Sequence, residues 1–149
     1  MRGREHFRIK AVKARKPSTL ILTFGDGVTM RVDVSAIIKR IPALAPLKNP
    51  KRFLKARVGE SGLTVDWVPG RLDMAGDNLR AEGVEQSGGI SHERIWEWMY
   101  RNGLTLDAAV EALGISRRML AYYRSGQKAV PRHIWLACLG WEVEHQKAA

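Results

Sequence analysis

Apolar and polar residues alternate along the first part of the chain with the period of two that is typical of β-strands. Short runs of this kind cover residues 9–15, 20–24, 28–34, 54–58 and 63–68. Gly25, Asp26 and Gly27 separate the second run from the third, and this composition predicts a β-hairpin. Helices are predicted over residues 36–40 and 74–81, with a loop over 43–52 between the strands. Residues 1–85 are therefore predicted to form a small α+β domain, with a mixed or antiparallel sheet and one or two short helices.

From residue 90 onward the apolar spacing changes to three and four residues, which is the period of an amphipathic helix. Residues 92–102 carry such a stripe, and a strongly apolar helix is predicted after Pro131. The stripe of the first helix is assigned to Ile95, Trp96, Met99 and Tyr100. The second half of the chain is therefore predicted to be an all-α domain over residues 90–149.

Two tryptophans of this half, Trp98 and Trp141, fall off the apolar stripes. Large apolar side chains outside a core are typical of protein interfaces. They are therefore candidates for a dimer surface, and the alternative is that they belong to the core like most tryptophans of this half.

The segment from Thr105 to Pro131 contains the signals of two short helices joined by a tight turn. Thr105 is a suitable N-cap, and Gly114 follows an apolar stripe at the point where a left-handed residue ends a helix. Ser116 is a second N-cap, and Gly126 follows the next helix. The segment therefore predicts two helices, over residues 106–113 and 116–125, that share one core.

The second of these helices is predicted to present a basic outer face. If Leu120 and Tyr123 point into the core, helical periodicity turns Arg117, Arg118, Ala121 and Tyr122 outward. The segment 116–132 has no acidic residue, and its basic residues are Arg117, Arg118, Arg124, Lys128 and Arg132. An arginine side chain can bond guanine O6 and N7 together, whereas lysine and arginine near the backbone hold phosphates. The alternative is an ordinary solvated helix face.

With these residues in register, the segment resembles the helix-turn-helix of the lambda-repressor/Cro-like family, also called the xenobiotic-response-element type. Thr105, Gly114, Ser116, Tyr123, Gly126 and Pro131 stand at the family's capping, turn and loop positions, whereas Leu106 and Val110 depart from its pattern. The resemblance implies that residues 116–125 are a recognition helix that enters the major groove. The implied contacts with double-stranded DNA are Thr105, Ser116, Arg117, Arg118, Ala121, Tyr122, Arg124, Gln127, Lys128 and Arg132.

The first half resembles a family of small bacterial α+β domains that has no characterised activity. The resemblance rests on the hairpin motif over residues 24–27 and on the strand end over residues 67–70. Members of that family occur alone, beside presumed toxin partners, or fused to helix-turn-helix domains. The resemblance therefore implies a regulatory or partner-binding module. Residues 85–89 are predicted to link it to the second half, because serine and glycine favour disorder and no apolar pattern crosses this segment.

The charge of the chain favours a polyanionic partner. The 149 residues carry a net charge of +10, and the sequence pI is about 10.3. Residues 1–85 hold 17 Lys and Arg against 9 Asp and Glu, so the first half is the more basic one. Membrane binding is not expected, because the chain has no long apolar run and its polar start lacks the apolar core of a signal peptide. A lone cysteine, Cys138, excludes an internal disulfide and favours a cytoplasmic protein.

No pattern in the sequence favours an enzyme. His6, His92, His133 and His145 have no metal-ligand spacing, and the sequence has no phosphate-binding loop. We therefore expect no metal and no cofactor. The sequence favours a bacterial transcriptional regulator that binds specific DNA as a homodimer. The alternative is an antitoxin-like interaction module whose basic first domain binds an acidic protein partner.

Overall fold

The protein combines β-sheets with α-helices, as the sequence predicts. The computed structural model describes residues 5–146. The chain divides into two compact units, one ending at Gln86 and the next beginning at Ser87. Each unit has its own hydrophobic core.

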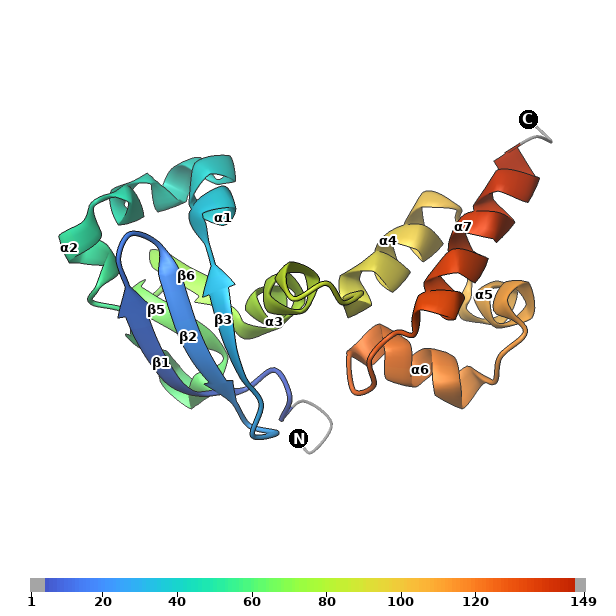
Figure 1. Ribbon diagram of the computed structural model, residues 1–149, viewed down its shortest axis with the longest axis horizontal. Coiled ribbons are helices and arrows are strands. Elements are labelled where there is room, and N and C mark those ends of the chain that lie inside the picture. The colour runs from blue at the N-terminus through green and yellow to red at the C-terminus, as the bar shows by residue number, and fades with distance from the viewer. Residues whose placement is uncertain (1–4, 147–149) are drawn as a thin grey trace. The chain divides into compact units, whose positions relative to one another are not determined.

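The first unit contains two three-stranded antiparallel sheets (Figure 1). The first sheet has the order β1 (Ile9–Arg15), β2 (Thr19–Phe24), β3 (Thr29–Asp33), and the second has the order β4 (Arg57–Val58), β5 (Thr64–Val68), β6 (Leu72–Ala75). Three short helices lie between the two sheets in the chain: α1 (Ser35–Arg40), the 3-10 helix η2 (Pro42–Lys48) and α2 (Pro50–Phe53). A second 3-10 helix, η3 (Glu60–Gly62), connects β4 to β5. Helix α3 (Gly76–Gln86) ends the unit and packs against β3 and β6.

The predicted hairpin at residues 25–27 is confirmed. Strands β2 and β3 pair with Leu20 opposite Val32 and Leu22 opposite Met30. Alternate residues of β2 point into the core, because successive side chains of a strand lie on opposite faces, and Leu20, Leu22 and Phe24 are fully buried.

The second sheet and helix α3 correct the predictions for residues 64–89. The stretch after Val68 was expected to end the sheet, but Gly70 adopts a left-handed conformation (φ 75°) and turns the chain into strand β6. The helix expected over 74–81 instead runs over Gly76–Gln86, so it includes two residues of the predicted linker, 85–89. Gly83 lies inside this helix and faces β3, where a Cβ atom would crowd the Met30 sulfur. Tertiary packing therefore outweighs the low helix propensity of glycine here.

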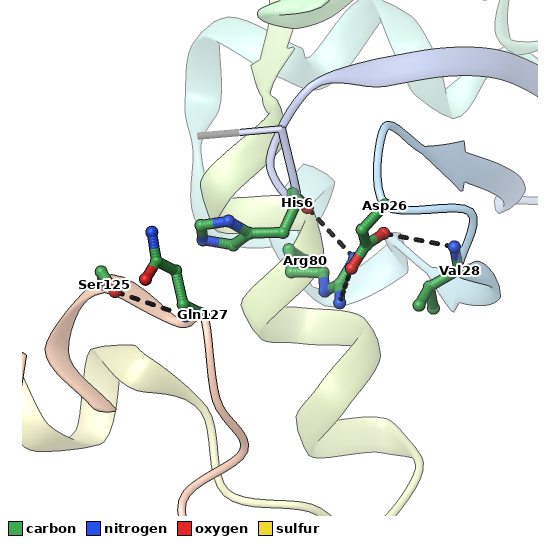
Figure 2. Close-up of polar contacts among 6 residues, drawn as sticks. All are labelled: His6, Asp26, Val28, Arg80, Ser125 and Gln127. Carbon is green, nitrogen blue, oxygen red and sulfur yellow. Dashed lines mark hydrogen bonds and ion pairs between the residues drawn. The ribbon is translucent and has the colours of Figure 1, made fainter. Parts of the chain in front are cut away.

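Arg80 of α3 joins three segments of the first unit. Its two terminal nitrogens donate to the Asp26 carboxylate at 3.1 and 2.8 Å, and one of them also donates to the His6 carbonyl at 3.1 Å (Figure 2). Its guanidinium also lies over the Phe24 ring, 4.9 Å from the centroid. Burial by itself would raise the pKa of Asp26, but hydrogen bonds from Arg80 and from the Val28 amide outweigh it, so that the pKa is lowered.

Asp26→Asn is expected to lower the free energy of unfolding of the first unit by about 1 kcal/mol at neutral pH, because it removes a partly buried charged pair. Since the folded-state pKa lies below the ordinary value of 3.8, the contribution of Asp26 is present above that value. It is lost as the pH falls through the folded-state pKa. Urea denaturation of the wild-type protein and the variant should therefore show a difference in the free energy of unfolding that is smaller at about pH 3 than at about pH 7. An equal difference at both pH values would mean that the Asp26 carboxylate does not cause it.

Four helices form the second unit: α4 (His92–Arg101), α5 (Leu106–Leu113), α6 (Arg117–Ser125) and α7 (Arg132–Gln146). Helix α4 packs against α6, and α5 packs against both α6 and α7. The lone cysteine, Cys138, is fully buried in the core between them, and burial raises the pKa of its thiol to about 12. A thiol of this kind is protonated at neutral pH and unreactive.

The apolar stripe of α4 differs from the prediction. Ile95, Trp98 and Met99 are buried, whereas Trp96 is 50% and Tyr100 is 90% exposed. Trp98 is therefore a core residue and not part of a dimer surface. Trp141 packs edge-on against it, with ring centroids 5.9 Å apart. Two overlapping stripes satisfy helical spacing in this segment, and only packing against α6 selects between them.

Candidate nucleic-acid interface

Helix α5 has the predicted bounds, and α6 ends as predicted but begins at Arg117, because Ser116 is its N-cap. The Thr105 hydroxyl accepts a hydrogen bond from the Ala108 amide at 3.1 Å, so it caps α5, and Gly114 ends that helix with φ 66°. Ser116 caps α6 by accepting from the Met119 amide, also at 3.1 Å. The turn between the two helices therefore places the start of α6 by local interactions.

Ser116→Ala is expected to lower the free energy of unfolding of the second unit by about 1 kcal/mol, because the Met119 amide loses its acceptor. Ser116→Asp is the matched control, since a carboxylate also caps a helix and favours its N-terminus. Thermal denaturation followed by circular dichroism should separate the two variants. If both were equally destabilised, the cap would not be the cause.

The outer face of α6 is basic. Leu120 and Tyr123 are buried on the inner face, as predicted. Arg117, Arg118 and Ala121 are exposed, and Tyr122 is half-buried beside them. Four of the predicted DNA contacts therefore lie together on one helix face.

Tyr122 connects Arg118 with Lys128. The Nε of Arg118 donates to the Tyr122 hydroxyl at 3.0 Å, and its guanidinium lies 5.7 Å from the ring centroid. The Lys128 Nζ lies 4.5 Å from the same centroid. The loop after α6 is held here, because the Lys128 amide also donates to the Tyr122 carbonyl at 3.3 Å. Cation–π contacts thus hold a lysine of the loop beside an arginine of the helix.

Arg117 pairs with a residue of the preceding helix. Its terminal nitrogen lies 2.6 Å from a carboxylate oxygen of Asp107, and both side chains are largely exposed. The pair brings the first turn of α5, which Thr105 caps, beside the first turn of α6. Periodicity within one helix could not reveal this contact, because the two residues belong to different helices; an acid near the start of α5 was its only signal.

Arg124 does not share the surface of Arg117 and Arg118. Its guanidinium stacks 3.9 Å from the ring centroid of Trp96, and the Trp96 indole N–H donates to the Arg124 carbonyl at 2.9 Å. Arg124 is half-buried, and its side chain lies along α4. The sequence analysis includes Arg124 among the basic residues of the segment. It could not predict the stacking of Arg124 on Trp96, because it assigned Trp96 to the core.

The two remaining predicted contacts are exposed. Gln127 follows the end of α6, and its amide donates to the Ser125 hydroxyl at 3.4 Å (Figure 2). Arg132 is the first residue of α7. Both therefore lie at the surface, Gln127 in the loop that carries Lys128 and Arg132 directly after that loop.

In the part of the chain that the structure describes, no group of three or more His, Cys, Asp and Glu side chains is placed to hold a metal ion. No helix within residues 5–146 is long and apolar enough to cross a membrane.

One solved structure is similar to nearly the whole chain. It is that of the candidate DNA-binding protein NE0471 from Nitrosomonas europaea, with 45% sequence identity and a TM-score of 0.83. The similarity covers 91% of the present chain and 86% of the other. No family model matches the chain, and neither does any curated protein sequence.

Proposed function

Because this chain belongs to the same family as NE0471 of Nitrosomonas europaea, we propose that it is a sequence-specific DNA-binding protein whose helix α6 enters the major groove. In this proposal α5, the turn at Gly114 and α6 act as a helix-turn-helix. The observation that carries the proposal is the position of two exposed arginines, Arg117 and Arg118, in the first turn of α6. Residues at the start of a recognition helix approach the base edges.

The two arginines have different roles in the proposal. Arg118 has a defined orientation before DNA arrives, because the Tyr122 hydroxyl accepts from its Nε. Its two terminal nitrogens can then donate together to guanine O6 and N7. Arg117 is paired with Asp107, which offsets part of its charge, so we assign Arg117 to base edges and not to the phosphates.

The residues around these arginines supply affinity without sequence information. Lys128, held against the Tyr122 ring, is assigned to a phosphate beside the groove. Gln127 and Arg132 are exposed close to Lys128 in the chain and extend the same role. Thr105 and Ser116 contribute through the N-termini of α5 and α6, which favour negative charge. Arg124 is assigned to the packing of α4 on α6 instead.

In this proposal the whole chain is a bacterial transcriptional regulator, and its first unit is a regulatory module. This assignment is supported by the separate core of each unit, which allows each to act as a module. An antitoxin-like interaction protein is the competing outcome of the experiment below.

The proposal is tested by fluorescence anisotropy of the whole protein with the duplex upstream of its own gene and with a scrambled duplex. Both duplexes are measured at two salt concentrations. We expect tight binding that prefers the native duplex and keeps that preference at the higher salt concentration. Equal binding to both duplexes, falling steeply with salt, would contradict sequence recognition. It would direct the search to a protein partner of the first unit.

A further inference from the structure

The segment from α1 to α2 concentrates the positive charge of the first unit. Residues 34–56 contain six Lys and Arg residues and no Asp or Glu, whereas residues 57–86 contain three basic and six acidic residues. All six cations are exposed, and we call them the α1–α2 basic surface: Lys39, Arg40, Lys48, Lys51, Arg52 and Lys55. A surface that served solubility alone would intersperse both signs of charge.

The backbone that carries these cations is fixed. Helices α1 and α2 each pack against η2, and the chain from α1 to α2 runs along one end of the first unit (Figure 1). The Asn49 side chain caps α2 by accepting from the Lys51 and Arg52 amides at 2.9 and 3.4 Å. Five residues of the three helices are buried in the core of the unit: Ile37, Ile38, Leu44, Leu47 and Phe53. The charges therefore project from a surface that is formed in advance of any partner.

No acidic side chain neutralises the α1–α2 basic surface. Within residues 5–146, none of its six members forms an ion pair. Other arginines of the chain do, since Arg80 pairs with Asp26 and Arg101 pairs with Glu142, each at 2.8 Å. Six unpaired like charges on one segment repel each other and attract an anion that can contact several of them at once.

The composition of this surface favours the backbone of duplex DNA over an acidic protein. Protein interfaces are centred on aromatic anchors, but Phe53 is the single aromatic residue of the segment and is fully buried. Phosphate contacts need only cations on extended side chains. The seven residues of η2 also separate Arg40 from Lys48 by roughly 14 Å, and a DNA strand has one phosphate for about every 3.4 Å of helix axis. The two ends of the surface can therefore contact different phosphates.

We propose that the first unit binds the phosphate backbone of double-stranded DNA through the α1–α2 basic surface. Contacts of this kind carry no sequence information, so the surface contributes affinity and leaves sequence preference unchanged. The inference goes beyond the proposed function, which assigns the DNA contacts to the second unit and a regulatory role to the first. It does not depend on base recognition by α6.

The surface is tested by fluorescence anisotropy of the whole protein with a scrambled duplex over a range of salt concentrations. We expect Lys51→Ala/Arg52→Ala to lower the affinity by roughly tenfold or more at about 50 mM salt. The slope of log affinity against log salt should become shallower by about 1–2, because fewer counterions are released when phosphate contacts are lost. The fold should survive, because both side chains are exposed and alanine keeps the two amides that Asn49 caps.

The matched control is Lys13→Ala/Arg31→Ala, which also removes one lysine and one arginine from the first unit. Both residues are exposed opposite Ile21 on the first sheet, outside the α1–α2 basic surface, so the slope should stay that of the wild type. Lys51→Arg/Arg52→Lys keeps both charges and should bind as the wild type does.

Equal losses in the two alanine variants would mean that only net charge matters, and would overturn the proposal. Wild-type binding by Lys51→Ala/Arg52→Ala would overturn it as well, and an acidic protein would become the expected partner. These comparisons use a scrambled duplex, whereas base recognition by α6 is measured by the preference for the native duplex. Failure of this inference is therefore distinct from failure of the proposed function.

Discussion

Replacing Arg117 and Arg118 together by alanine is expected to remove the preference of the protein for its native duplex. Each guanidinium that bonds a guanine contributes about 1–3 kcal/mol of discrimination, so the double variant should lose roughly thirtyfold to twenty-thousandfold in specific affinity if the two contributions add. The fold should survive, because both side chains are exposed on the outer face of α6. Fluorescence anisotropy with the native and scrambled duplexes measures the effect.

The matched control for this variant is Lys51→Ala/Arg52→Ala. It removes the same two positive charges from exposed positions of α2, in the other unit. Loss of charge alone weakens binding to all duplexes and lowers the salt dependence, but leaves sequence preference unchanged. The control should therefore keep the preference. If Arg117→Ala/Arg118→Ala also kept it, α6 would not read bases.

Trp98→Ala is expected to lower the free energy of unfolding of the second unit by about 3–5 kcal/mol, because it opens a large cavity in a small core. Trp98 is fully buried and packs with Ile95, Leu120 and Cys138 in the core cluster of this unit. The first unit has a separate cluster and should keep its own unfolding transition. Differential scanning calorimetry, with far-ultraviolet circular dichroism to assign the helical transition, tests both statements.

Trp98→Phe is the control that separates cavity formation from the loss of the indole N–H. The described part of the structure gives this buried N–H no hydrogen-bond partner, so its removal should cost little in itself. We expect a loss of about 1–2 kcal/mol, from the smaller volume of phenylalanine. If Trp98→Phe lowered the free energy of unfolding as much as Trp98→Ala, the indole N–H would be essential for stability. Equal losses in both transitions would mean that the two units do not unfold independently.

The parts of the site that the sequence predicts are those that depend on neighbours in the chain. A cap needs only a hydroxyl and an amide three residues later, as at Thr105 and Ser116. A helix end needs only a residue that tolerates positive φ, as at Gly114. For the same reason the β2–β3 hairpin could be predicted from its glycines.

The parts that the sequence misses depend on contacts between distant residues. Trp98 and Trp96 of α4 are both aromatic, and either stripe satisfies helical periodicity. Only contact with α6 decides that Trp98 is fully buried and that Trp96 stacks on Arg124. The pairing of Arg117 with Asp107 similarly requires two helices to be placed first.

The sequence by itself determined the α+β character of the chain, the bounds of α5 and α6, and the excess of positive charge near α6, because propensity, capping and composition are local properties. Tertiary structure alone decided which basic side chains share a surface, since Arg118 and Lys128 meet on Tyr122 whereas Arg124 turns to Trp96. It also decided that α3 continues through Gly83, where a Cβ atom would crowd the Met30 and Val32 side chains of β3. The direction of a side chain depends on which face of its helix is buried against other elements. The periodicity of apolar residues within one helix cannot specify which face that is.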